Sequence, residues 1–234
     1  MSNLKELIKT RRLYFDGGTG TVLQSMGLPA GTPPEKWNIE HPEKITELHN
    51  RYLDAGCNII KSNTFGVNCN KYDNYAELIE KALDCAKSAV SGRECVFVAF
   101  DMGPTGRLLK PLGDLDFEEA VEIFGANVRV AAECCADLIL IETMNDSYET
   151  KAAVLAAKEN CDLPIFVTNV YDESGKLMTG AVPSAMIALL EGMGVDALGM
   201  NCSLGPDMML GILDEFIENA SVPVIAAAGC PWAV

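Results

Sequence analysis

Short runs of nearly continuous hydrophobic residues alternate along the chain with longer segments in which hydrophobic residues recur every three or four positions. The short runs are rich in β-branched residues, as strands buried on both faces are. They predict strands at Leu13–Phe15, Asn58–Ser62, Val96–Asp101, Leu138–Glu142, Ile165–Val170, Ala197–Asn201 and Val222–Ala226. The longer, amphipathic segments predict helices at Glu43–Ala55, Asn74–Val90, Phe117–Cys135, Tyr148–Glu159, Ser184–Met193 and Asp207–Glu218. Asp146 and Glu149 have the spacing of a capping box at the start of one of these helices.

Strands that alternate with helices predict a parallel sheet, for which two architectures compete. A doubly wound sheet that binds a dinucleotide has a GxGxxG turn after its first strand, whereas residues 17–20 read GGTG. An α/β, TIM-like (β/α)8 barrel fits better, and the predicted strands lack only the eighth βα unit. We therefore predict a single barrel domain over residues 1–234. Its open edges, at the first and last predicted strands, favour a homo-oligomer or a partner segment that pairs with them.

Composition and charge exclude several classes of protein. The 234 residues are 49% hydrophobic and 22% charged, as in a globular domain, and no apolar run is long enough to cross a membrane. The first residues lack the apolar core of a signal peptide, and nine cysteines are an odd number for a secreted disulfide framework, so we expect a cytoplasmic protein. A net charge of −15 disfavours binding to nucleic acid or to an anionic membrane.

Barrel enzymes carry their chemistry at the carboxyl ends of the strands, so the residues that follow the predicted strands are the candidates for a site. The polar and glycine residues at these positions include Asp16, Gly17, Gly18, Asn63, Thr64, Glu142 and Asn201. The carboxylates of Asp16 and Glu142 can hold an ammonium group or act as general acid and base, although capping a helix is an alternative role for each. Backbone amides of the glycine turn can bind a carboxylate. Together these groups point to an amino acid substrate.

The remaining candidates are a thiol and a lysine, because the rim has no histidine. His41 and His49 both lie at or near the first long helix, which excludes a Ser-His-Asp triad and a histidine metal site at the rim. Cys202 ends a strand just before a helix, a position that favours a metal-binding thiolate, with a buried core cysteine as the alternative. Lys61 ends the second strand and leaves an aldolase or decarboxylase open as a further reading.

Several motifs, taken together and in order, resemble one family. They are FDGGTGTVLQSMGL, PEKWN, YLDAGCNIIKSNTFG, GPTGRLLKPLGDL, LILIETMND and LGMNCSLGP. In sequence and spacing they resemble the homocysteine S-methyltransferase family, in particular the homocysteine-binding domain of cobalamin-dependent methionine synthases. The resemblance runs from about Leu13 to about Ile225 and so covers most of the chain.

The resemblance implies a (β/α)8 barrel that binds homocysteine at its rim. The amino acid end of homocysteine would lie near the Asp16-Gly17-Gly18 turn and Glu142. Its sulfur would become the fourth ligand of a zinc ion held by three cysteines, of which the one in the NCS motif corresponds to Cys202. Zinc would stabilise the homocysteine thiolate. The methyl group would come from methylcobalamin on a separate module, which makes a corrinoid protein or module a partner of this chain.

The chain departs from the family pattern in its cysteines. The family has its other two zinc cysteines in a GGCC motif, which is absent here. Cys134 and Cys135 are adjacent, but they precede a strand and so lie about 17 Å from its carboxyl end, against a zinc–sulfur bond of about 2.3 Å. Three explanations remain open: a truncated enzyme, a catalytically impaired homologue that binds an amino acid or a partner protein, and a rebuilt metal site of Cys202, Cys230 and Cys69.

Overall fold

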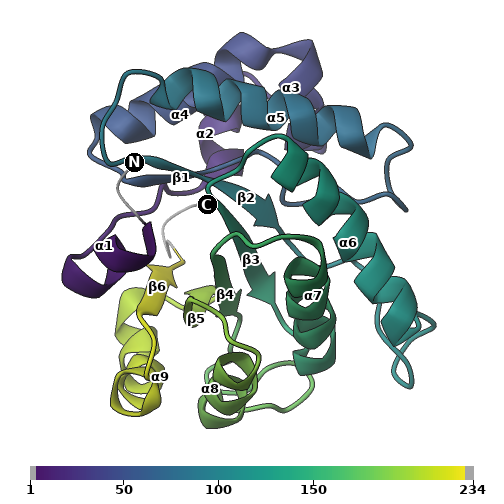
Figure 1. Cartoon of the computed structure of the whole chain (residues 1–234), viewed down its shortest axis with the longest axis vertical. Helices are drawn as coiled ribbons and strands as arrows, with labels where there is room; N and C mark the ends of the chain where they lie inside the picture. The colour runs from purple at the N-terminus through teal and green to yellow at the C-terminus, as the bar shows by residue number, and fades with distance from the viewer. Residues whose placement is uncertain (1–3, 230–234) are drawn as a thin grey trace. The chain divides into compact units, whose positions relative to one another are not determined.

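The structure, a computed structural model, describes residues 4–229 (Figure 1). Helices and strands alternate through most of this length, in the order α1 (Leu4–Thr10), α2 (Thr19–Ser25), η1 (Pro34–Lys36), α3 (Trp37–Glu40), α4 (Pro42–Asp54), β1 (Ile59–Lys61), α5 (Tyr75–Val90), β2 (Phe97–Met102), α6 (Phe117–Glu133), β3 (Leu138–Met144), α7 (Ser147–Asn160), β4 (Ile165–Asn169), α8 (Pro183–Gly192), β5 (Ala197–Cys202), α9 (Pro206–Asn219) and β6 (Val224–Ala228). None of the helices within residues 4–229 has the length and hydrophobicity that a membrane span needs.

The strands follow one another in the sheet in the same order as in the sequence, from β1 to β6. β1 pairs in parallel with β2, and β4, β5 and β6 pair in parallel with one another. The register places Ile59 beside Phe97 and Cys202 beside Ala228. Parallel neighbours joined by helices are the βα repeat that the sequence predicts.

Six of the predicted strands are confirmed, and the first is not formed as a strand. Instead, Phe15 makes a single parallel bridge to Ile59, and the carbonyl of Tyr14 accepts hydrogen bonds from the N–H groups of Asn58 and Ile59. The pairing ends at once because the chain turns at the glycines that follow Asp16. A segment of three residues, opposite a β1 strand that is itself three residues long, offers too few backbone groups for a longer ladder.

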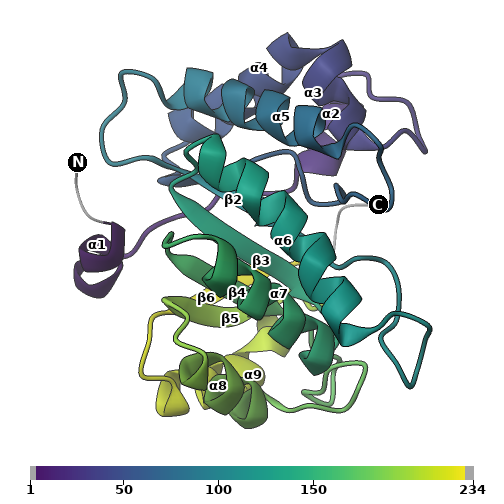
Figure 2. The same cartoon turned by 45° about the vertical axis from the view of Figure 1, so that its right-hand side comes forward.

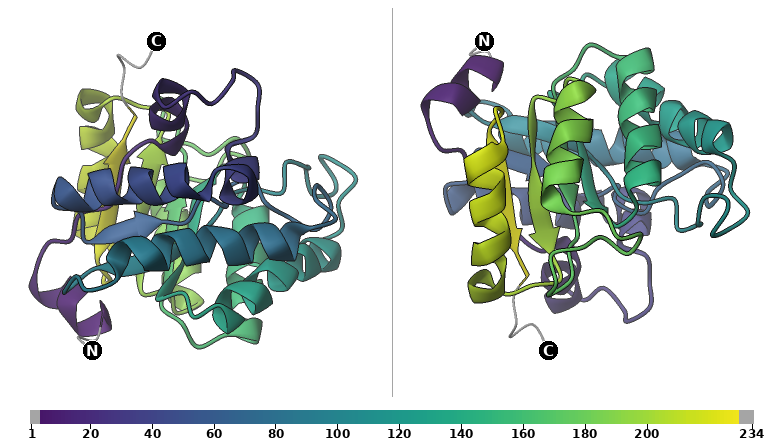
Figure 3. Two further views of the ribbon diagram at one scale, coloured as in Figure 1. Left: turned by 90° about the horizontal axis from the view of Figure 1, so that it is seen from above. Right: turned by 90° about the horizontal axis from the view of Figure 1, so that it is seen from below.

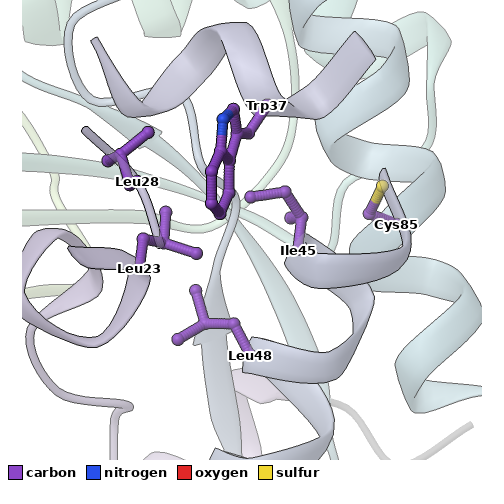
Figure 4. Packing of buried hydrophobic residues seen from close by; sticks show 6 residues of the cluster. All are labelled: Leu23, Leu28, Trp37, Ile45, Leu48 and Cys85. Atoms are coloured by element: carbon purple, nitrogen blue, oxygen red, sulfur yellow. The ribbon is translucent and has the colours of Figure 1, made fainter. Parts of the chain in front are cut away.

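The described chain divides into two compact units, residues 4–102 with 126–139 and residues 103–125 with 140–229. A single domain over the whole length stays a prediction. In the first unit, α4 and α5 lie side by side (Figure 2). A hydrophobic cluster beneath them joins α2, α3, α4 and α5, and is made of Leu23, Leu28, Trp37, Ile45, Leu48 and Cys85 (Figure 4).

In the second unit, α8 packs beside α9, and α9 lies along β6 (Figure 3). Pro183 and Pro206 begin the two helices, where the missing N–H of proline has no helical partner to lose. Gly199 lies in β5, and a Cβ at this position would collide with the backbone carbonyl of Ile225. The glycine therefore allows close approach of the backbones of β5 and β6.

Candidate functional site

The Asp16-Gly17-Gly18 turn lies in the first unit and is held by both backbone and side chains. Asp16 is 8% exposed, and its Oδ2 accepts a hydrogen bond of 2.9 Å from the N–H of Lys61. The hydroxyl of Tyr52 donates to the carbonyl of Gly18 over 3.0 Å. Burial, and then the charge of Asp16, raise the pKa of Tyr52, which keeps this hydroxyl a donor. A Cβ at Gly17 would lie 3.0 Å from the same hydroxyl, so a side chain there would disturb the turn.

The predicted site residues Asn63 and Thr64 are buried in the loop after β1, also in the first unit. The Asn63 amide donates to the Asn38 side chain and to the carbonyl of Pro34, over 2.8 Å in each case. The hydroxyl of Thr64 donates to the carbonyl of Asp101 over 2.7 Å. These bonds fix the loop that follows β1. A contact of either side chain with substrate stays a prediction.

Glu142 lies near the carboxyl end of β3 in the second unit and is partly exposed. The next residue, Thr143, has a φ of 63°, a left-handed conformation that β-branched residues rarely adopt. Asn201, in β5, holds this residue by two hydrogen bonds. Its Oδ1 accepts from the Thr143 N–H over 3.0 Å, and its Nδ2 donates to the Thr143 hydroxyl over 2.8 Å. These bonds thus link Thr143, which follows Glu142 in the chain, to Asn201, which precedes Cys202.

Cys202 ends β5 as an exposed thiol on a strained turn. Both Cys202 and Ser203 have left-handed φ angles, of 60° and 49°. The hydroxyl of Ser203 donates to the carbonyl of Tyr171 over 2.9 Å, and the N–H of Gly229 donates to the carbonyl of Leu204 over 2.9 Å. Left-handed non-glycine residues cost of order 1–3 kcal/mol each and persist only where the surroundings hold them. These bonds hold the turn that directly follows Cys202.

Of the capping box predicted at α7, the structure confirms the N-cap but not the second residue. Asp146 is the N-cap, and its Oδ1 accepts from the N–H of Tyr148 over 2.9 Å. Glu149 does not complete the box; its Oε1 accepts from the N–H and the hydroxyl of Thr105, over 2.8 and 2.6 Å. Burial raises the pKa of Glu149, and the two bonds from Thr105 lower it. Glu149 therefore anchors the loop after β2 instead of capping the helix.

The described residues do not by themselves form a zinc site. Within residues 4–229, no group of three or more His, Cys, Asp and Glu side chains is placed to hold a metal ion. Cys202 suits one thiolate ligand, whereas tetrahedral zinc takes four. The Sγ of Cys69 lies 4.0 Å from Oδ1 of Asn70, a weak contact at the limit for sulfur, and Cys230 lies outside the described residues. Cys134 and Cys135 lie in the turn between α6 and β3, as expected from the sequence, on which they were rejected as ligands.

Three of the predicted site residues, Glu142, Asn201 and Cys202, lie in β3 and β5 within one unit, and Asn201 contacts Thr143, the neighbour of Glu142. The others, Asp16, Gly17, Gly18, Asn63, Thr64 and Cys69, belong to the first unit. The sequence indicated Thr143 and Ser203 only as polar residues that follow predicted strands, and it gave no sign of their part in the strained turns or of the part of Tyr171. A left-handed φ at a residue other than glycine leaves no local sign in the sequence.

Comparisons with known proteins give the fold and the family. Two crystal structures of the homocysteine methyltransferase MmuM from Escherichia coli are similar, the apo form (21% identity, TM-score 0.84, 98% of this chain and 87% of that chain) and the metallated form (20%, 0.86, 97% and 87%). This likeness shows the fold, an α/β barrel of the TIM type. The methionine synthase of Mycobacterium leprae is 28% identical over 98% of this chain, which spans 21% of that relative. The methionine synthase of Mycobacterium tuberculosis is 26% identical over the same shares. The model of the family described as homocysteine S-methyltransferase matches residues 13–232, and the chain therefore belongs to the homocysteine S-methyltransferase family.

Proposed function

We propose that this chain provides the site at which homocysteine accepts a methyl group. The family match over residues 13–232 supports the reaction class. The observation that supports the proposal within the structure is the pair of hydrogen bonds between Thr143 and Asn201, the sequence neighbours of Glu142 and Cys202. One unit thereby presents a carboxylate and a thiol at the ends of two strands, which are the groups that the two ends of homocysteine need.

In the proposed complex, the carboxylate of Glu142 binds the ammonium group of homocysteine, and the sulfur of homocysteine lies at Cys202. An ion pair that is partly shielded from water holds an ammonium group better than an exposed one. In the transfer, the substrate thiol first loses its proton to solvent, and the resulting thiolate forms a bond to the methyl carbon. The bond between the methyl group and its carrier breaks, its electron pair stays with the carrier, and the product is the thioether methionine. Contacts of Asp16, Gly17, Gly18, Asn63 and Thr64 with the substrate stay predictions from the sequence.

Cys202 is the zinc ligand of this proposal, since residues 4–229 hold no group of three or more His, Cys, Asp and Glu side chains placed to bind a metal ion. Support comes from the similarity to MmuM, of which a metallated form is known. When bound in this family, zinc would hold the substrate sulfur as a thiolate, a free thiol with a pKa of about 8.5 being mostly protonated at neutral pH. The other ligands would come from outside residues 4–229.

The methyl donor is proposed to be methylcobalamin on a separate corrinoid module. The chain spans about a fifth of the length of its methionine synthase relatives, so a donor module would lie in the remaining part. S-methylmethionine, the donor of another branch of the family, is the competing methyl source.

Methionine formation tests this function. Purified protein is incubated with homocysteine, zinc and either methylcobalamin or S-methylmethionine, and methionine is measured by mass spectrometry. The proposal expects methionine with one of the donors, dependence on zinc, and loss of both activity and bound zinc in Cys202→Ser. Equal zinc content in the wild type and Cys202→Ser would remove Cys202 from the ligands. No methionine with either donor would contradict the transfer reaction for this chain.

A second candidate function is a module that binds an amino acid without catalysis. It is favoured by one observation, that residues 4–229 hold no three-ligand metal cluster. Such a module would bind homocysteine or methionine equally well with and without a metal chelator, whereas the zinc-dependent enzyme would lose homocysteine affinity when the chelator is added.

Self-association and a cytoplasmic location are the remaining proposals. β6 is the last strand in the order of the described sheet, and its residues 226–228 are exposed. An exposed strand edge offers N–H and C=O groups to another chain. Sedimentation velocity would show a dimer or larger species if this edge pairs with a second copy, and a monomer at high concentration would contradict it.

A further inference from the structure

We propose that Asn201 and Thr143 form a positioning clamp that sets the separation of Glu142 and Cys202 and thereby selects the length of the substrate amino acid. The proposal rests on the function proposed above and deepens it. It assigns Asn201 a different role from the direct substrate contact expected from the sequence.

The first step concerns what the Asn201 side chain can still bind. Asn201 is 7% exposed, and its two polar atoms both bond to Thr143. An amide that accepts from the backbone and donates to the hydroxyl of the same residue is held in one orientation. Its neighbour in the chain, Cys202, is exposed, and Glu142, the neighbour of Thr143, is partly exposed. Asn201 therefore acts on a ligand mainly through these neighbours.

The second step concerns the strands that the clamp connects. β4 lies between β3 and β5 in the sheet. Neighbouring strands are about 4.8 Å apart, which places next-but-one strands at about 10 Å in a flat sheet. Hydrogen bonds of 3.0 and 2.8 Å between Asn201 and Thr143 thus show that the ends of β3 and β5 approach each other across the end of β4. The two hydrogen bonds link these ends directly, and the proposed clamp sets their spacing.

The third step concerns backbone strain. Thr143 and Cys202, on the two sides of the clamp, both have φ angles near 60°. Strain of this kind persists where the surrounding structure over-determines it, and it is found most often at functional sites. Without the clamp, Thr143 has a lower-energy backbone available in the ordinary β region. Its relaxation would move Glu142, the residue directly before it.

Fixed spacing has a chemical consequence for the substrate. Cysteine and homocysteine carry the same amino and carboxylate groups, and cysteine has one methylene fewer between them and its sulfur. A rigid separation of the Glu142 carboxylate and the Cys202 thiol accepts one of these lengths and rejects the other. A loose separation accepts both.

The test is the ratio of the affinities for homocysteine and cysteine, measured by calorimetric titration of the whole chain. Asn201→Ala is expected to lower the affinity for homocysteine by about tenfold, the effect of about 1.4 kcal/mol at 25 °C, and the affinity for cysteine by less than about threefold. A merely structural role would lower both affinities by the same factor, and that result would overturn the clamp. Affinities for the two amino acids that are the same in Asn201→Ala as in the wild type would overturn it as well.

Three further variants keep the test decisive if Asn201→Ala folds poorly. Thr143→Val retains the shape and the N–H of Thr143 but loses the hydroxyl. It should lower the ratio of the affinities for homocysteine and cysteine by about threefold. Thr143→Ser keeps both bonds and should retain the wild-type ratio. The matched control is Asn127→Ala, which removes a buried amide bond of 2.7 Å to the carbonyl of Val67 in the first unit and should leave the ratio unchanged. If the wild type binds neither amino acid, the proposed function fails together with the clamp. If the wild type binds and the variants lose affinity for homocysteine and cysteine by the same factor, the clamp alone is refuted.

Discussion

The left-handed backbone at Ser203 predicts an unusual order of stability for two substitutions at one position. Ser203 has a φ of 49°, and its hydroxyl donates to the carbonyl of Tyr171 over 2.9 Å. Ser203→Ala and Ser203→Gly both remove this hydrogen bond. Only alanine keeps a Cβ in the left-handed region, so the difference between the two variants measures the strain of the turn that carries Cys202.

The expected magnitudes follow from the bond and the backbone. Loss of the hydrogen bond destabilises both variants by about 1 kcal/mol. A Cβ in the left-handed region carries roughly 1–2 kcal/mol of strain, which glycine avoids. The greater entropy of glycine in the unfolded chain offsets about 0.5 kcal/mol of this gain. Ser203→Gly should therefore be about 1 kcal/mol more stable than Ser203→Ala and close to the wild type.

Urea unfolding followed by circular dichroism measures this difference, provided that the slope against urea is the same for both variants. Ser88, exposed in the last turns of α5, is the matched control. At that helical position alanine should be more stable than glycine by about 1 kcal/mol, the reverse order. If Ser203→Gly is no more stable than Ser203→Ala, the turn is not strained.

Three other predictions concern stability. Gly199→Ala places a Cβ against the Ile225 carbonyl and should lower the free energy of unfolding by about 1–3 kcal/mol. Gly211→Ala, in α9 with open space around it, is the control and should raise that free energy by about 0.5–1 kcal/mol. Both are measured by urea unfolding, and similar effects at the two sites would contradict the close approach of β5 and β6. Burial lowers the pKa of His49 from 6.5 to about 4, so the unfolded chain takes up a proton at a higher pH than the folded chain does. About 3 kcal/mol of unfolding free energy should therefore be lost as the pH falls from about 6.5 to about 4. A pH series in which His49→Gln loses the same amount of unfolding free energy would disprove this. Asp146→Ala should cost about 1 kcal/mol through loss of the N-cap of α7, and Asp146→Asn should retain most of it, which thermal unfolding would show.

The regular elements around the core were predictable because their residues are buried in a repeating pattern. β2 and β4 are buried at every position, and such runs of hydrophobic residues are what the sequence analysis identified as strands. The short helices α2 and α3 were not predicted. They have 7 and 4 residues, too few to show a repeated helical period, and Leu23 and Trp37 hold them by packing in the cluster with Ile45. Contacts of this kind are not encoded in local sequence.

The candidate site was predictable in its residue types but not in its arrangement. Glu142 and Cys202 were found because they lie at or near the carboxyl ends of strands in a parallel sheet. The role of Asn201 depends on Thr143, which is 58 positions away, and that of Glu149 depends on Thr105, 44 positions away. Such pairings follow from the curvature and loop paths of the fold, so no pattern within one segment predicts them.

Protection of Cys202 by homocysteine tests the central claim most directly. Alkylation of the protein by iodoacetamide is followed at individual cysteines by peptide mass spectrometry, with Cys95, an exposed thiol of the first unit, as the internal reference. Because homocysteine consumes some reagent, the measured quantity is the ratio of the two alkylation rates. The account predicts that saturating homocysteine lowers the rate at Cys202 relative to Cys95 by about tenfold or more, the protection expected for a site occupied more than nine tenths of the time. A ratio that homocysteine leaves unchanged would show that the substrate sulfur does not lie at Cys202.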